Sequence, residues 1–144
     1  MRNQTSTKAR PPARRRRAAP PALRQRFDGR GLLALRSAVA AYAAELGAGD
    51  RLDDMVLVAH ELSTNVVRHG GGHGELRLWR DGDRLLCRVT DAGPGMADAA
   101  GHGGELPAPH LPGGRGLWIV RRLSAVRIET GSDGTTVTAS MPLP

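Results

Sequence analysis

The sequence predicts an α+β fold, a two-layer α/β sandwich in which helices cover one face of a mixed, mostly antiparallel sheet. Two segments carry apolar residues at helical spacing, and two strand-like runs joined by Asp81-Gly82 follow them. After a long stretch rich in Gly and Pro, a third helical segment and a second pair of strands complete the chain. The order helix, helix, hairpin, loop, helix, hairpin is typical of helices gathered on one side of a sheet built from hairpins.

The first half of the chain is predicted to be mainly helical. A short strand is expected at Leu23–Phe27, and Gly29–Gly31 separates it from the first helix. Asp50 is a candidate N-cap for the second helix, which ends in the glycine run 70–72. The apolar stripe of the first helix comprises Leu32, Leu33, Leu35, Val39, Tyr42, Ala43 and Leu46, and that of the second comprises Met55, Val58, Ala59, Leu62 and Val66.

The second half of the chain is predicted to supply the rest of the sheet. Strands are expected at 75–80 and 84–90, on either side of the Asp81-Gly82 turn, and at 125–130 and 135–141, joined by the turn 131–134. A helix is expected over 116–124, and residues 96–112, rich in Gly, Pro, Ala and His, predict a loop. Cys87 lies in an alternating apolar pattern, which predicts a small buried side chain.

The net charge of +7 is unevenly distributed along the 144 residues. Residues 1–26 hold nine Lys/Arg and no acid, whereas the remaining twelve basic and fourteen acidic residues leave residues 27–144 at −2. The proline-broken, arginine-rich segment 1–22 predicts a disordered basic tail, and 23–144 predicts one domain. The tail is either an electrostatic arm for nucleic acid or another anionic partner, or a solvated extension.

The composition argues against several other classes of protein. A single cysteine excludes a disulfide within one chain, and no run approaches the roughly 20 apolar residues of a membrane span. No charged start leads into an apolar signal core, so a cytoplasmic protein is expected. Phe27, Tyr42, Trp79 and Trp118 are the only aromatic residues, which disfavours single-stranded nucleic acid as a ligand that stacks on aromatic rings.

A polar stripe on the second predicted helix is the first of three candidate functional motifs. Glu61, Asn65 and His69 recur at one-turn spacing beside the apolar face, where a helix borders a cleft. A carboxamide oxygen together with phosphate oxygens suits a partial magnesium shell, and a carboxylate one turn away can orient or deprotonate a nucleophile. Taken alone, the same spacing also fits a solvated helix edge.

The other two motifs contain glycines beside a polar group. Asp91 ends a predicted strand and is able to accept a hydrogen bond from an exocyclic amine, while Gly93 and Gly95 permit positive φ and the approach of a planar ring. The segment 113–117, Gly-Gly-Arg-Gly-Leu, opens a predicted helix, where free backbone N–H groups suit phosphate oxygens. It matches neither a Walker loop nor a dinucleotide fingerprint. Taken alone, these motifs also fit an ordinary turn and a flexible loop.

In this order, the motifs resemble the ATP-binding domain shared by gyrases, heat-shock chaperones, histidine kinases and mismatch-repair ATPases. Within that group they are similar to the bacterial anti-sigma factor family, which are stand-alone serine/threonine kinases. The segment 61–69 resembles the asparagine box of that family, Asp91–Gly95 its first glycine box, and 113–117 its second. Gly134-Thr135-Thr136-Val137 resembles its last conserved strand, so the resemblance covers residues 23–143.

The resemblance implies a role for each of these residues and for two cofactors, ATP and Mg²⁺. Asn65 is expected to hold the magnesium ion, and Glu61 to act as general base or to polarise the attacking hydroxyl. Asp91 is expected to bind the adenine amino group, assisted by Thr135. The remaining expected contacts are Gly93 and Gly95 at the base, residues 96–112 as the ATP lid, and Gly114, Arg115, Gly116 and Leu117 at the phosphates.

The resemblance also implies protein partners. The expected phosphate acceptor is a serine on a small anti-sigma antagonist, the expected sequestered partner is a sigma factor, and the first helices are candidates for a homodimer contact. One alternative is a binding module that holds ATP without phosphotransfer. Another is a catalytic fragment of a histidine kinase, although no separate dimerisation domain is predicted in these residues. His60-Glu61-Leu62-Ser63-Thr64 echoes the phosphoacceptor box of such kinases, but it lies inside the asparagine box itself.

Overall fold

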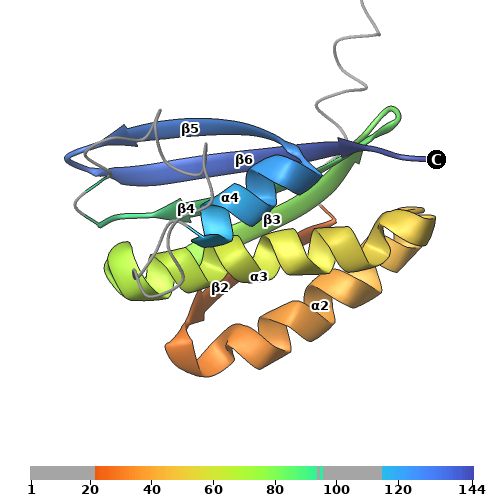
Figure 1. The fold of residues 1–144 in the computed structure, drawn as a ribbon. Coiled ribbons are helices and arrows are strands. Elements are labelled where there is room, and N and C mark those ends of the chain that lie inside the picture. The colour runs from red at the N-terminus through yellow and green to blue at the C-terminus, as the bar shows by residue number, and fades with distance from the viewer. Residues whose placement is uncertain (1–21, 94, 96–114) are drawn as a thin grey trace, which may run out of the picture.

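The computed structural model describes residues 22–93, 95 and 115–144. Within these ranges the chain forms two layers, with three α-helices on one face of a five-stranded sheet (Figure 1). This confirms the predicted two-layer α+β architecture. The predicted basic tail before residue 22, the predicted lid at 96–112 and the glycines at 113 and 114 lie outside the described residues.

The sheet contains β2 (Leu23–Asp28), β3 (His73–Asp81), β4 (Arg84–Asp91), β5 (Ala125–Gly131) and β6 (Gly134–Pro142). Its strand order is β2-β3-β4-β6-β5, and each neighbouring pair is antiparallel. The sequence predicts a mixed, mostly antiparallel sheet, and the described strands are all antiparallel. The two predicted hairpins, β3–β4 and β5–β6, are confirmed. The pairing of β4 with β6 places Asp91, at the end of β4, opposite Thr135, near the start of β6.

The helices are α2 (Leu32–Glu45), α3 (Leu52–His69) and α4 (Arg115–Leu123), with 3-10 turns η1 (Gly29–Gly31) and η2 (Gly49–Arg51) before the first two. All three predicted helices are confirmed. The expected N-cap at Asp50 is wrong, because Asp50 lies inside η2, which runs directly into α3 without a side-chain cap. Asp53 and Asp54 instead place negative charge in the first turn, where the helix dipole favours it.

The core between the two layers is built mainly from Leu, Val and Ala side chains, with Phe27 as its buried aromatic residue. In α2 the predicted apolar stripe is correct for Leu35, Val39 and Ala43, which are buried. It is wrong for Leu33 and Tyr42, which are 75% and 37% exposed. The reason is that α2 lies at the margin of the helical layer, beside α3, so only a narrow strip of its surface meets the core.

Cys87 lies in the middle of β4 and is fully buried, as its apolar surroundings predict. Burial disfavours the thiolate and raises the pKa of the Cys87 thiol to about 12. The thiol therefore packs as a small apolar group. Separately, no helix in the described ranges is long and apolar enough to cross a membrane.

Candidate functional site

Two of the predicted site residues, Glu61 and Asn65, lie one turn apart on α3 and are half-buried. On the same helix, Leu62 and Val66 point into the core, so Glu61 and Asn65 lie along the margin of the apolar face. His69, the third member of the predicted stripe, is exposed at the last residue of the helix. The structure therefore keeps Glu61 and Asn65 together and leaves His69 at the surface.

The start of α4 packs against this margin of α3. A Cβ added at Gly116 would lie 2.6 Å from Oε1 of Glu61 and 3.6 Å from Oδ1 of Asn65. Leu117, the next residue, is 2% exposed and anchors the first turn of α4 in the core, whereas Arg115 is exposed. The end of the predicted phosphate loop thus meets the predicted magnesium residue and the predicted base, although the two segments are far apart in the sequence.

The first turn of α4 carries backbone N–H groups without partners inside the helix, as every helix N-terminus does. Such groups favour an anion, and the helix dipole adds to the attraction. Here a carboxylate from Glu61 already lies close to that helix end. A carboxylate, a carboxamide and the N-terminus of α4 therefore lie together along one margin of α3. This combination suits an anion that binds together with a metal cation.

Asp91 is the last residue of β4, and its carboxylate is held in place by the backbone. Oδ1 accepts hydrogen bonds from the backbone N–H groups of Gly93 at 2.9 Å and of Thr135 at 3.3 Å. Thr135 is the register partner of Asp91 in β6, and its hydroxyl hydrogen-bonds with that of Thr130 at 2.8 Å. One carboxylate oxygen is therefore occupied by the backbone, which leaves Oδ2 to accept from a donor elsewhere.

Gly70, at the C-terminal end of α3, lies directly beside Asp91. A Cβ added at Gly70 would be 2.5 Å from Oδ2 of Asp91, and one added at Gly93 would be 2.5 Å from the carbonyl carbon of Gly70. Gly93 is thus required by close packing, and it does not use the positive φ that a glycine permits. Gly95 does have a positive φ of 86°, and a Cβ there would collide with the carbonyl oxygen of Gly131.

The two groups of site residues are arranged along α3. Glu61 and Asn65 lie beside α4, and Gly70 with Asp91 lies at the C-terminal end of the helix. With a rise of 1.5 Å per residue, Asn65 and Gly70 are separated by about 7.5 Å along the axis. The two groups of predicted site residues are therefore held at different points along the same helix.

Sequence reasoning missed two residues that position this site. It treated Gly70 only as a helix stop signal, because nothing local shows that Asp91 packs against it.

Sequence reasoning also overlooked Arg51, whose Nη2 donates to the carbonyl oxygen of Leu123 at 3.0 Å and whose Nη1 lies 3.4 Å from Oδ2 of Asp54. Arg51 thus ties the start of α3 to the last turn of α4. Arg51 precedes the acidic first turn of α3, and nothing in that local sequence indicates a contact with Leu123.

His60 is the residue that resembles the phosphoacceptor of histidine kinases. It is half-buried on α3, next to Glu61 in sequence. Its Nδ1 is buried without a hydrogen-bond partner in the described ranges, and so are Oγ of Ser63 and Oγ1 of Thr64. Because Ser63 is fully buried, that part of the helix faces neighbouring elements. If the chain acted as a histidine-kinase fragment, His60 would join the candidate site residues described above as a phosphoacceptor.

Comparison with known proteins gives one match by sequence family and several by fold. The sequence model of the histidine kinase-like ATPase domain family matches residues 9–141, which is most of the chain. No curated protein matches the sequence. In fold, the chain is similar to the histidine kinase domain from the Erythrobacter litoralis EL346 blue-light activated histidine kinase, with a TM-score of 0.53 and 22% identity. That alignment covers 85% of this chain and 61% of the other, so the chain spans less than two thirds of that domain.

Two further structures show the same fold at lower identity. The mycobacterial sensor histidine kinase MprB has a TM-score of 0.53 and 17% identity, and the alignment covers 84% of this chain and 98% of that structure. The catalytic domain of histidine kinase ThkA has a TM-score of 0.54 and 13% identity, covering 84% of this chain and 96% of that one. At these identities the likeness concerns the fold alone.

Proposed function

The chain belongs to the histidine kinase-like ATPase domain family, and on that basis we propose that it is an ATP-binding regulatory protein with serine/threonine kinase activity. In this proposal it binds ATP with Mg²⁺ and transfers the γ-phosphate to a serine of a small antagonist protein. It also sequesters a sigma factor, so that phosphorylation of the antagonist controls transcription. The kinase activity and both partners come from the resemblance of the motifs to the anti-sigma family.

One observation carries the proposal, namely the contact of Gly116 with Glu61 and Asn65. It brings the predicted phosphate loop, metal residue and base to one place. The donor chemistry fits, since Mg²⁺ prefers oxygen ligands and keeps several waters, so that the carboxamide oxygen of Asn65 and phosphate oxygens suffice. When bound, the ion neutralises charge on the phosphates. The absence of a Cβ at Gly116 allows the Glu61 carboxylate to lie close to the start of α4.

The fixed carboxylate of Asp91 supports recognition of adenine. Two backbone N–H groups hold Oδ1, and Oδ2 is left to accept a hydrogen bond from an exocyclic amino group. Because the acceptor is already oriented, little conformational entropy is lost when the base binds. A guanine would present a carbonyl oxygen in place of the amine, which an ionised carboxylate repels.

Glu61 is the proposed proton acceptor. The serine hydroxyl attacks the γ-phosphorus, the bond to the leaving ADP oxygen breaks, and the hydroxyl proton passes to the Glu61 carboxylate. Most of the rate then comes from alignment and charge neutralisation. The half-buried position of Glu61 beside the start of α4 supports this role, because a phosphate bound at that helix end would lie next to the carboxylate.

A homodimer through the first helices is part of the proposal. Leu33 and Tyr42 of α2 are exposed, as is Leu57 of α3, which is 39% exposed. Exposed large apolar side chains on neighbouring helices are available for a contact with a second copy.

Two substitutions test the proposal. Asn65→Ala is expected to abolish magnesium-dependent ATP binding in calorimetry, whereas Glu61→Gln is expected to keep binding and lose transfer from γ-labelled ATP to a co-encoded antagonist. Full transfer by Glu61→Gln would remove Glu61 from the mechanism. The stability of the label in acid separates the alternatives, because phosphoserine survives acid and phosphohistidine does not. Magnesium-dependent binding without any transfer would support the binding module.

A further inference from the structure

No described helix covers the face of the sheet opposite the helices (Figure 1). The strand sequences place many arginines on this face. Successive strand residues point to opposite faces, so where Leu85, Cys87 and Val89 are buried, their neighbours point outward. The same alternation holds in the other strands. The arginines of this open face are Arg24, Arg26, Arg77, Arg84, Arg88 and Arg127.

The positive charge of this face is neutralised unevenly. At the β2–β3 side, Glu75 accepts hydrogen bonds from Nε of Arg24 and from Nε of Arg77, each at 3.1 Å. Across β4 and β6, Nη2 of Arg84 donates to the hydroxyl of Ser140 at 2.9 Å, and Nε of Arg88 to that of Thr138 at 3.1 Å. No carboxylate in the described ranges pairs with Arg84 or Arg88. Uncompensated charge therefore lies over β4 and β6.

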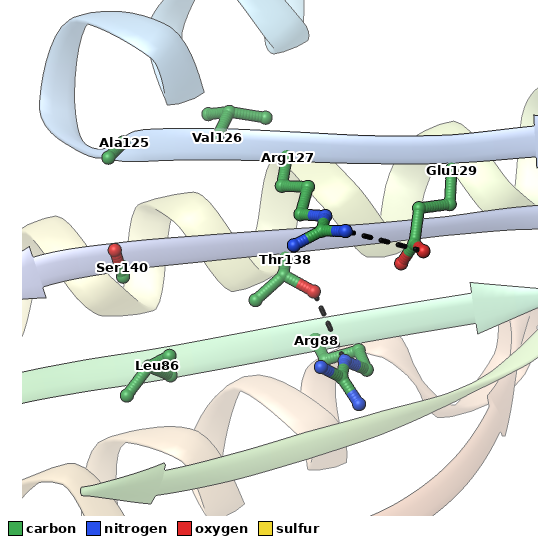
Figure 2. Close-up of a pocket in the computed structure, with 8 residues that line it drawn as sticks. All are labelled: Leu86, Arg88, Ala125, Val126, Arg127, Glu129, Thr138 and Ser140. Carbon is green, nitrogen blue, oxygen red and sulfur yellow. Dashed lines mark hydrogen bonds and ion pairs between the residues drawn. The ribbon is translucent and has the colours of Figure 1, made fainter. Parts of the chain in front are cut away.

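A pocket of about 520 Å³ lies at this location (Figure 2). Leu86 and Ala125 give it an apolar part, and Arg88 and Arg127 border it. Arg127 is 79% exposed, and its ion pair with Glu129 is long, at 3.9 Å. Such an exposed pair contributes little and is easily exchanged for another anion. The pocket thus combines apolar surface with guanidinium groups that are available to carboxylates.

We propose that this open sheet face, centred on Arg84, Arg88 and Arg127, is a docking surface for an acidic segment of a partner protein that alternates carboxylates with apolar side chains. Bidentate Arg–carboxylate pairs would hold the segment, and an apolar side chain would fill the pocket beside Leu86. The inference does not depend on the nucleotide site, which lies among the helices on the other face of the sheet.

Other occupants fit the surface less well. A second copy would bring arginines against arginines, and like charges at an interface are strongly unfavourable. The N-terminal segment of this chain is itself basic and cannot neutralise the face. Single-stranded nucleic acid needs free aromatic rings, but the Trp79 ring on this face is already covered by the guanidinium of Arg88 at 5.3 Å. A phosphate backbone would also leave the apolar part of the pocket unused.

The test measures binding of the full chain to a fluorescent peptide of alternating Glu and Leu, by anisotropy at physiological salt. Arg88→Gln/Arg127→Gln is expected to weaken binding about tenfold or more, because desolvated charge pairs are lost. The matched control Arg14→Gln/Arg15→Gln removes the same charge from the N-terminal segment and is expected to change affinity much less. Leu86→Asn should weaken binding of the Glu/Leu peptide and spare that of a peptide of Glu alone.

Three results would overturn the proposal. Equal losses in the two double variants would show that net charge alone attracts the peptide. A mixed-sequence DNA oligonucleotide that binds more tightly than the peptide, and depends more strongly on Arg88 and Arg127, would assign the face to nucleic acid. Self-association that is lost in Arg88→Gln/Arg127→Gln, measured by sedimentation velocity, would assign it to a second copy. An unchanged urea-unfolding midpoint in the variant confirms that the fold is intact.

Discussion

Asp91 and Thr135 lie opposite each other in β4 and β6, and the backbone N–H of Thr135 donates to Oδ1 of Asp91 at 3.3 Å. The sheet register itself therefore orients the carboxylate. The side chain of Thr135 is not required for this bond, because the donor is its backbone N–H. Its hydroxyl hydrogen-bonds with that of Thr130 instead. The expected role of Thr135 in binding adenine stays a prediction, to which the structure adds this main-chain contact with Asp91.

Asp91→Asn is expected to keep the fold and lose ATP. An asparagine oxygen can still accept from Gly93 and Thr135 at the Oδ1 position, but its amide then presents a donor to the donating amine of adenine. Loss of a hydrogen bond to a charged group, with unpaired donors left behind, corresponds to about 2–3 kcal/mol. Calorimetry with and without Mg²⁺ measures this loss. The control Asp83→Asn lies in the β3–β4 turn, and equal weakening there would remove Asp91 from the base site.

Gly70→Ala tests the packing of the α3 terminus against Asp91. The new Cβ would lie 2.5 Å from Oδ2 of Asp91 and 3.0 Å from Cα of Val66, so backbone or carboxylate must move. Overpacking of this kind costs about 1–3 kcal/mol, and displacement of the carboxylate should also weaken ATP binding. Gly31→Ala is the matched control, since a Cβ there meets nothing within 4 Å. Urea unfolding and calorimetry are the two measurements, and identical behaviour of the two variants would contradict the observed contact.

Gly116→Ala is expected to separate binding from turnover. Its Cβ meets Oε1 of Glu61, the far end of a flexible side chain, so the carboxylate can rotate away at low cost to folding. Alanine also favours a helix more than glycine does, by about 1 kcal/mol. The variant should therefore unfold at the wild-type denaturant concentration or higher, bind ATP within severalfold of wild type, and transfer phosphate slowly. Normal transfer would show that the position of Glu61 is unimportant.

Glu75 should contribute to stability in a pH-dependent way. Burial by itself raises the pKa of Glu75, but hydrogen bonds and charge from Arg24 and Arg77 outweigh it, so that the pKa lies below the ordinary value of 4.5. A depressed carboxyl pKa stabilises the fold above 4.5, and this contribution is lost as the pH falls through the folded-state value. Glu75→Gln should cost about 0.5–1 kcal/mol at neutral pH, because the arginines are partly exposed.

Urea unfolding of Glu75→Gln and wild type at neutral pH and at about pH 3 checks this, since most carboxylates are protonated at the lower value. The difference between the two proteins should shrink in acid. A difference that grows there would mean that the ion pairs are not the cause. Glu129→Gln, at an exposed pair 3.9 Å long, serves as a control with a smaller expected effect at both pH values.

Cys87 should react only when the protein unfolds. Its pKa of about 12 and complete burial leave almost no accessible thiolate at neutral pH. A thiol reagent is therefore expected to label the native chain at a rate that rises steeply with urea and follows global unfolding. Rapid labelling of the native protein, at the rate of a free thiol, would contradict the burial of β4.

Much of the fold could be predicted from local sequence. The apolar stripe of α3, the Asp81-Gly82 turn and the alternation in β4 each arise from neighbouring residues, and each is confirmed. The faces of α2 were harder, because Leu33 and Tyr42 follow the helical spacing and are exposed only since α2 lies at the margin of its layer. The N-cap at Asp50 failed because a 3-10 turn continued the chain into α3 without needing one.

The sequence indicates which residues are candidates for the site, but it does not indicate which residues they contact. Glu61, Asn65 and Asp91 stand out by residue type and spacing, whereas Gly70 and Arg51 act through residues distant in sequence. The cationic sheet face has a weak sequence signal, which is arginine alternating with apolar residues in several strands. That pattern is equally typical of any solvated sheet, so only the strand order and the hydrogen bonds show where the charge gathers.

The contact between Gly70 and Gly93 separates two kinds of evolutionary constraint. Gly93 cannot gain a side chain without moving the backbone of Gly70, and a Cβ at Gly70 would press on Val66 of its own helix and on the Asp91 carboxylate. Selection for folding alone would therefore favour both glycines, even in a descendant that has lost its ligand. Glu61 and Asn65 lie outside the packed interior, and folding places no comparable demand on them. Among related chains, the glycine pair would therefore mark inheritance of the architecture, and the polar pair would mark which lineages have kept the chemistry.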